Sequence, residues 1–299
     1  MMRIIGFKSA RLLVMLFVFC QPSRSVAPVD SLRENALYCT EDDRVIFDDY
    51  IGNVKSSKSL PFADLVIVTA RFFMNRPYVA STLEFEPEGL AVNLRGFDCS
   101  TFVETVLALA RTVKIYDHPA FEDFCGQLRQ IRYRAGIIND YTDRLHYFTD
   151  WIYENERRGI VRDVTEKAGG KPYRPNLNFM SSHPESYRQL QSNPGYVAVM
   201  REKEREISGR NAYSFIPESG IGACGHALED GDIVCFVTGI KGLDVAHVGF
   251  VCRSGGLLTF IHASLSAKKV IVNSQPVSVY AGKIKHCRGI MAVRPLDAD

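Results

Sequence analysis

Residues 96–110 read GFDCSTFVETVLALA, and this stretch predicts the start of a buried helix. Its apolar residues recur at the three- and four-residue spacings that place side chains on one helical face. These residues are Phe102, Val103, Val106, Leu107 and Ala110. An aspartate directly before such a pattern is a common N-cap, so we expect Asp98 to cap a helix that begins close to Cys99.

A cysteine in the first turn of a helix is well placed to act as a nucleophile. The unpaired amides of that turn and the positive end of the helix dipole favour thiolate over thiol, which predicts a lowered pKa for Cys99. The same amides can stabilise an oxyanion. Cys99 taken alone is better explained as a buried structural cysteine, so the functional interpretation needs a base elsewhere in the chain.

The order of the expected elements predicts an α+β fold. Residues 26–111 read as mainly helical, including 62–73, and residues 112–226 as a polar, aromatic-rich stretch with short helices, one of them over 200–207. Residues 227–295 read as strands with glycine-containing turns between them. The expected strands are 232–238, 246–252, 257–264, 269–273 and 290–294. Helices followed by an antiparallel sheet are typical of α+β proteins.

Two histidines in this strand region fall into register. If residues 253–256 form a four-residue hairpin loop, Cys252 pairs with Leu257, and His247 then lies directly opposite His262 on one face of the sheet. A base and a group that orients it need this closeness. A slip of one residue in the register would move one histidine to the other face.

The net charge and the N-terminal sequence indicate what the protein binds and where it is located. The chain has 299 residues, 46% hydrophobic and 23% charged, with a net charge of +2, so we expect a globular protein and no nucleic-acid partner. Residues 1–25 read as a signal peptide that directs export across the inner membrane, to the periplasm, and no apolar run is long enough to span a bilayer. A lipid anchor on Cys20 is the alternative, although Phe19 is bulky for that signal.

Seven cysteines follow the predicted signal peptide, and an odd number leaves at least one thiol unpaired in an oxidising compartment. Cys235 and Cys252 lie inside expected strands and are interpreted as buried apolar residues. There is no Cys-x-x-Cys pair, so a structural zinc site is not expected. Catalysis by a thiol and an imidazole needs no metal or organic cofactor, so none is expected.

Four short segments resemble the NlpC-type superfamily of papain-like cell-wall cysteine peptidases and amidases. They are Asp-Cys-Ser-x-Phe-Val at 98–103, Leu-Glu-Asp-Gly-Asp-Ile-Val at 228–234, His-Val-Gly-Phe-Val at 247–251 and His-Ala at 262–263. The resemblance covers about 62–111 and 227–295. It implies a papain-like core in which Cys99 is the nucleophile, His247 the base and His262 the group that orients the base. The segment 77–79 also resembles a family segment whose tyrosine, here Tyr78, lies near the oxyanion.

The long separation between Cys99 and His247 predicts an inserted subdomain over residues 112–226 of a single catalytic domain, 26–299. Insertions between catalytic elements usually shape the substrate cleft. Residues 141–151 and 179–184 resemble a branch of N-acetylmuramoyl-L-alanine amidases that act on anhydro-muropeptides. Within 141–151, Leu145, Phe148 and Trp151 are expected in the core. The expected substrate contacts are Asp98, Ser100, Arg144, His146 and Tyr147.

The sequence therefore predicts a cysteine amidase that cuts between N-acetylmuramic acid and L-alanine in peptidoglycan fragments. The nearest alternative is an endopeptidase that cuts the stem peptide after D-glutamate. More distant alternatives are an acyltransferase or transglutaminase-like enzyme, an inactive peptidoglycan-binding module, and a metal site built from Cys99 and the two histidines.

Overall fold

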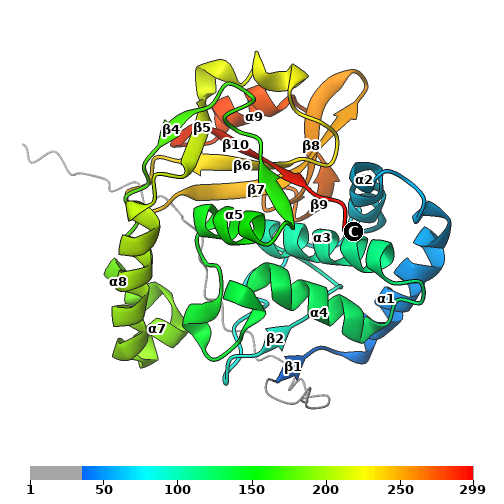
Figure 1. The fold of residues 1–299 in the computed structure, drawn as a ribbon, viewed down its shortest axis with the longest axis horizontal. Coiled ribbons are helices and arrows are strands. Elements are labelled where there is room, and N and C mark those ends of the chain that lie inside the picture. Colours follow the sequence, from blue (N-terminus) through cyan, green and yellow to red (C-terminus); the bar gives the residue numbers. More distant parts are fainter. Residues whose placement is uncertain (1–35, 299) are drawn as a thin grey trace, which may run out of the picture.

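The computed structural model describes residues 36–298 as a layer of helices packed against a sheet (Figure 1). The predicted signal peptide and Cys20 lie outside these residues. The helical layer contains α1 (Glu41–Val54), α2 (Phe62–Phe72), α3 (Cys99–Ile115), α4 (Phe121–Arg132) and α5 (Phe148–Arg157). No helix in the described part of the chain is both long and apolar enough to cross a membrane.

Helix α3 lies at the centre of the molecule. It contacts α2 and α4 within its own layer and strands β7 and β8 of the sheet. Because neighbours surround it on several sides, it is buried well beyond the single predicted stripe: Thr105, Ala108 and Leu109 are buried as well. This packing fixes the position of the helix start, where Cys99 lies.

The main sheet has the strand order β4-β5-β10-β6-β7-β8-β9, every pair is antiparallel, and β3 pairs with β10 beside β5. Its strands are β3 (Val161–Asp163), β4 (Lys171–Tyr173), β5 (Tyr213–Pro217), β6 (Ile233–Thr238), β7 (Val245–Ser254), β8 (Leu257–Ser264), β9 (Lys269–Val272) and β10 (Cys287–Pro295). A small parallel pair joins β1 (Leu37–Tyr38) to β2 (Leu90–Ala91). The predicted α+β class and the five predicted strands are confirmed, with ends that move by up to three residues.

Both faces of the sheet are covered. One face packs on α3 through residues such as Val248 and Phe250, and the other packs on α9 (Val277–Lys283), a helix that the sequence analysis did not predict. Strand β6 is buried along its whole length, in keeping with the unbroken apolar run of residues 233–237. Cys235 and Cys252 are fully buried, as predicted.

The hairpin between β7 and β8 differs from the prediction. Ser254 pairs with Leu257, so the loop has two residues, Gly255 and Gly256, rather than four. Both glycines have positive φ, 57° and 80°, which a two-residue type I′ turn requires. The register therefore shifts by two residues. The predicted direct opposition of His247 and His262 is wrong, but a shift of two keeps both side chains on one face.

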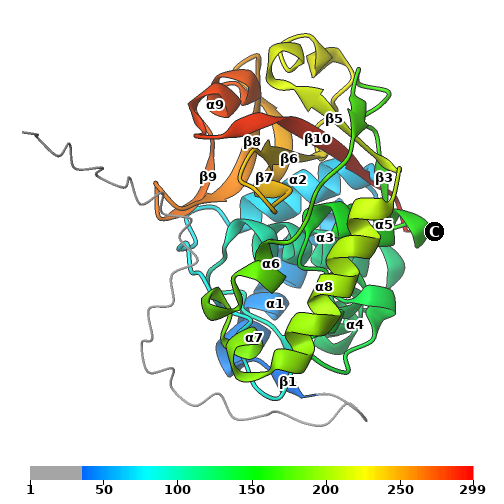
Figure 2. The ribbon, with the colours of Figure 1, turned by 90° about the vertical axis from the view of Figure 1, so that its left-hand side faces the viewer.

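Residues 112–226 contribute strands to this same sheet. β5 and β3 pair with β10, and β4 pairs with β5. The segment also supplies α4 and α5 to the helical layer and α6 (Phe179–Ser182), α7 (Arg188–Ser192) and α8 (Pro194–Gly209) beside it (Figure 2). Met180 of α6, Tyr187 directly before α7, and the β6–β7 loop line one side of a pocket.

Candidate active site

Cys99 is the first residue of α3, and Asp98 caps the helix as predicted. Asp98 Oδ1 accepts hydrogen bonds from the backbone nitrogen and the hydroxyl of Thr101, both at 2.8 Å, and Thr101 Oγ1 accepts one from the Asp98 backbone nitrogen at 3.0 Å. Asp98 lines the pocket next to the thiol. Its carboxylate is nevertheless engaged in holding the helix start, which fixes the backbone of Cys99.

The Cys99 thiol is protonated at neutral pH. Burial raises the pKa of this thiol to about 12, the charge of Asp98 raises it further, and a backbone hydrogen bond from Val248 opposes both effects. The predicted lowering of the pKa is therefore wrong for this conformation, because the loss of hydration outweighs the helix N-terminus. Among the side chains of residues 36–298, that of Ser100 forms a hydrogen bond with the thiol, with its Oγ 4.0 Å from Cys99 Sγ.

His247 and His262 form a hydrogen-bonded pair. His247 Nε2 lies 2.6 Å from His262 Nδ1, and the two rings are nearly perpendicular at 83°. The β7–β8 pairing ends at Phe250 and Ile261, and continuing this register by one residue places Gly249 across from His262. A Cβ on Gly249 would lie 3.0 Å from His262 Cβ and 2.7 Å from the carbonyl oxygen of Ile261, so only glycine gives the two strands this separation.

Both imidazoles are neutral at pH 7. Burial lowers the pKa of His247 to about 4, and burial together with the charge of His247 lowers the pKa of His262 to about 2. A neutral imidazole is the form that can accept a proton from a thiol.

The hydrogen bond between the rings determines which nitrogen is available for that proton. His247 uses Nε2 toward His262, so Nδ1 remains to act as the base. Nδ1 must then carry a lone pair, so the proton of neutral His247 is on Nε2 and is donated to His262 Nδ1. His262 carries its own proton on Nε2, a buried atom without a hydrogen-bond partner among the described residues.

The Cys99 thiol and the His247 imidazole pack against opposite faces of the sheet. Cys99 and Val248 belong to the core on the α3 side, whereas His247 packs against Phe236, Phe260 and Tyr280 on the α9 side. No hydrogen bond joins Cys99 to His247 in this conformation of the described chain. Catalytic hydrogen bonds are often long without substrate and tighten in the complex.

Two tyrosines lie near the thiol. Tyr78 lines the pocket, and burial raises its pKa, so its hydroxyl stays protonated and can donate a hydrogen bond. Gly96 makes this placement possible, because a Cβ there would lie 2.6 Å from Val79 and 2.9 Å from the carbonyl oxygen of Pro77. Tyr280 of α9 was not predicted. Burial, followed by the charge of Cys99, raises its pKa to about 12, and its ring packs on both histidines.

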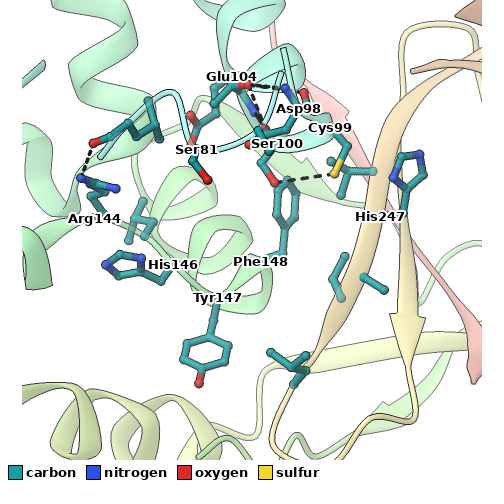
Figure 3. Close-up of a pocket in the computed structure, with 18 of the residues that line it drawn as sticks. Ser81, Asp98, Cys99, Ser100, Glu104, Arg144, His146, Tyr147, Phe148 and His247 are labelled. Atoms are coloured by element: carbon teal, nitrogen blue, oxygen red, sulfur yellow. Dashed lines mark hydrogen bonds between the residues drawn. The ribbon is translucent and has the colours of Figure 1, made fainter. Parts of the chain in front are cut away.

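A pocket of about 620 Å³ connects these groups with residues 141–147 (Figure 3). Cys99 and His247 lie at one end, and Arg144, His146 and Tyr147 lie at the other. Ser100 and Tyr78 also line it. The pocket thus brings together eight of the nine predicted site residues, and the ninth, His262, lies behind His247. Its size suits a ligand of several hundred daltons.

Four hydrogen bonds hold the guanidinium group of Arg144 to other parts of the protein. Its Nε and Nη2 bind the carboxylate of Glu88 at 2.6 and 2.8 Å, its Nη1 binds Glu84 at 3.1 Å, and Nη2 also donates to the carbonyl oxygen of Leu83 at 2.6 Å. Arg144 therefore fixes residues 83–88 along one wall of the pocket.

His146 presents a ring nitrogen to the pocket, whereas Tyr147 presents its aromatic ring. His146 Nε2 lies 2.8 Å from the carbonyl oxygen of Tyr141 and must donate to it, so Nδ1 is an acceptor, and burial lowers its pKa to about 3. The Tyr147 hydroxyl donates to Glu204 at 2.6 Å and accepts from the backbone nitrogen of Met180 at 3.1 Å. Tyr147 therefore presents its ring to the pocket. Leu145, Phe148 and Trp151 are buried, as predicted.

A half-buried cysteine at a helix start, with one neutral imidazole in the same pocket and a second imidazole hydrogen-bonded to the first, is a site suited to acyl transfer through a thiol. The described residues contain no cluster of three or more side chains that could hold a metal ion. Comparison of the whole chain with known proteins identifies its family. A family model described as AmiA-like, N-acetylmuramoyl-L-alanine amidase-like, matches residues 68–290, and this chain belongs to that family.

Solved structures of similar proteins cover most of the chain. An N-acetylmuramoyl-L-alanine amidase from Bacteroides uniformis is 36% identical, with a TM-score of 0.75 over 79% of this chain and 99% of the other. A protein from Bacteroides fragilis, whose name proposes a xylanase, is 35% identical, with a TM-score of 0.70 over 76% and 99% of the two chains. A Legionella pneumophila protein that is 20% identical, with a TM-score of 0.65 over 86% and 95%, shares the fold. A search of curated protein sequences finds no match.

Proposed function

We propose that this protein is a cysteine amidase that hydrolyses the bond between N-acetylmuramic acid and L-alanine in peptidoglycan fragments, with anhydro-muropeptides as the expected substrates. The observation that carries the proposal is that Cys99 and His247 line one pocket, with His262 hydrogen-bonded to His247, in a chain from an amidase-like family. The Bacteroides uniformis relative, named as an amidase of this bond, supports the choice of substrate.

The proposed reaction has two steps. The Cys99 thiol gives its proton to His247 Nδ1 as the sulfur attacks the lactyl carbonyl carbon, and the C–N bond then breaks as His247 returns the proton to the amine of L-alanine. The product is a thioester on Cys99. In the second step His247 takes a proton from water, the resulting hydroxide attacks the thioester, and the released thiolate recovers the proton.

The remaining residues support this chemistry. His262 holds the plane and tautomer of His247, and the amides at the start of α3 together with the Tyr78 hydroxyl stabilise the tetrahedral oxyanion. Because the thiol has a raised pKa and the imidazole a lowered one, a stable ion pair between them is unfavourable in the resting site. Proton transfer therefore accompanies the attack on the carbonyl carbon.

We further propose that α3 and the strands β6 to β10 correspond to a papain-like core of the NlpC type, and that residues 112–226 are the insertion that shapes the sugar-binding wall. Export through residues 1–25 to the periplasm, where such fragments are released, fits this substrate. A lipid anchor on Cys20 remains the alternative form of export.

A glycosidase function, as the name of the Bacteroides fragilis relative proposes, has less support from the pocket. Glycoside hydrolysis needs two carboxyl groups free to act as acid and base or nucleophile. The acidic residues that line the pocket are all engaged by the protein itself: Glu104 binds Arg132 at 2.6 Å, Glu84 binds Arg144, Asp98 caps α3, and Asp244 binds Thr149.

Mass spectrometry of defined disaccharide-peptides after incubation with residues 26–299 tests the proposal. We expect free disaccharide and a peptide that begins with L-alanine, and neither product from Cys99→Ala. Fragments cut after D-glutamate would instead establish the endopeptidase. Cleavage between the two sugars would establish the glycosidase.

A further inference from the structure

The charged side chains that line the pocket differ in whether the protein already neutralises them. Six of the seven are bound by other groups of the chain: Glu84, Asp98, Glu104, Arg132, Arg144 and Asp244. The Arg132 guanidinium, for example, binds Glu104 and the carbonyl oxygen of Ala91, each at 2.6 Å. The seventh is Lys285, which is exposed and forms no ion pair with any carboxylate in residues 36–298.

Lys285 lies in the loop between α9 and β10 and lines the same pocket as His247. The backbone carbonyl oxygen of the next residue, His286, accepts a hydrogen bond from the Gly239 backbone nitrogen at 2.6 Å. Gly239 follows β6, the strand in which Phe236 pairs with His247. The loop is therefore tied to the sheet a few residues from the proposed base, and a free ammonium group stands at the pocket on that side.

The chemistry of the proposed substrate places all of its negative charge on one side of the scissile bond. The carboxyl of the lactyl group is consumed in the amide itself, and the sugar carries hydroxyl and acetamido groups. The peptide side carries carboxylates, first the free α-carboxylate of D-glutamate, the second residue. Because consecutive residues are 3.8 Å apart, this carboxylate lies about 6 Å from the scissile nitrogen, within reach of an extended lysine side chain.

We propose that Lys285 binds the α-carboxylate of the second stem-peptide residue and so selects substrates that are acidic at that position. This inference rests on the proposed function. An ammonium group offers three donors on a flexible stem, which suits a carboxylate held at the pocket edge. The other charged groups that line the pocket are already bound by the protein, so they offer the anionic group no alternative site.

Measuring kcat/KM for enzyme variants on substrates with and without the α-carboxylate tests the inference. Wild type, Lys285→Ala and Lys283→Ala are compared on disaccharide-peptides that carry D-glutamate or D-isoglutamine, in which a carboxamide replaces the α-carboxylate. Lys283 is the matched control, because it is an exposed lysine at the end of α9 that does not line the pocket. We expect Lys285→Ala to lower kcat/KM for the D-glutamate substrate about tenfold and for the D-isoglutamine substrate less than twofold, as for a lost charged hydrogen bond.

Lys285→Glu should reverse the preference, so that the carboxamide becomes the better substrate, and Lys283→Ala should leave both values unchanged. Equal losses on the two substrates with Lys285→Ala would overturn the inference. A D-glutamate substrate with an amidated C-terminus is compared as well, and the inference would also be overturned if the Lys285→Ala loss disappeared on that substrate. Failure of wild type to release an L-alanine-led peptide from either substrate would contradict the proposed function itself, so the two failures are distinguishable.

Discussion

Adding one methyl group at Gly249 should disable the site while leaving the rest of the sheet in place. The new Cβ of Gly249→Ala would lie 2.7 Å from the carbonyl oxygen of Ile261, 2.7 Å from the ring of Phe260 and 3.0 Å from His262 Cβ. Contacts below 3.0 Å force atoms to move, and here the neighbours include backbone. Strands β7 and β8 must separate locally, and His262 must move away from His247.

The size of the effect follows from the 2.6 Å hydrogen bond between the rings. A displacement of about 1 Å in a catalytic group costs on the order of 100-fold in rate, and overpacking a core position costs about 1–3 kcal/mol of stability. We therefore expect kcat to fall about 100-fold, with a folded protein of somewhat lower Tm. The assay is kcat and KM on a disaccharide-peptide, with thermal unfolding of the same sample.

The hairpin itself supplies the control. Gly255→Asn changes the turn of the same hairpin at a position with φ of 57° and no atom within 4 Å, where asparagine is tolerated in a type I′ turn. It should retain full activity. Normal kcat in Gly249→Ala, or an equal loss in both variants, would refute the reasoning that Gly249 sets the distance between the two histidines.

Three further predictions concern the proposed catalytic groups and the pocket wall. Cys99→Ala should abolish turnover with the fold intact by circular dichroism, His247→Ala should be nearly as damaging and His262→Ala less so; small and equal losses for the two histidines would contradict their roles. Because the His247 imidazole is neutral above its lowered pKa of about 4, kcat/KM should be lost only as pH falls toward 4. Because the pKa of the Cys99 thiol is raised, its alkylation by iodoacetamide should accelerate steadily with pH above 7. An alkylation rate that is already constant from pH 5 upward would instead reveal a thiolate–imidazolium pair. Arg144→Ala should destabilise the protein by about 3–5 kcal/mol in urea unfolding, because it leaves the buried Glu88 carboxylate without a cationic partner. Wild-type stability together with weaker disaccharide binding would show that Arg144 is a substrate contact instead.

Local patterns in the sequence were enough to predict the elements that carry the site. The helix that begins at Cys99 with Asp98 as its cap depends on neighbouring residues, and strand β8 was predicted with its observed ends, 257–264. Apolar periodicity and turn residues act over a few positions, so a single sequence contains this information.

Features that depend on distant contacts could not be predicted in the same way. Both glycines of the hairpin adopt positive φ, which shortens the loop, and two adjacent glycines were the available signal for that turn. Helix α9 is seven residues long, and nothing in its sequence places Tyr280 against the histidines. The ion pair of Arg144 is made with Glu88, 56 positions away in the sequence. The sequence could therefore predict that Arg144 lies in the pocket, but it could not predict which residues bind its guanidinium group.

Intact-mass analysis of the acid-quenched reaction tests the central claim most directly. Wild-type protein and Cys99→Ala are mixed with a disaccharide-peptide for a short time, denatured in acid, weighed and digested to locate any adduct. The account predicts a wild-type adduct on Cys99 with the mass of the disaccharide acyl group, and no adduct on the variant. An adduct that also contains L-alanine and D-glutamate, or product release by Cys99→Ala at the wild-type rate, would contradict it.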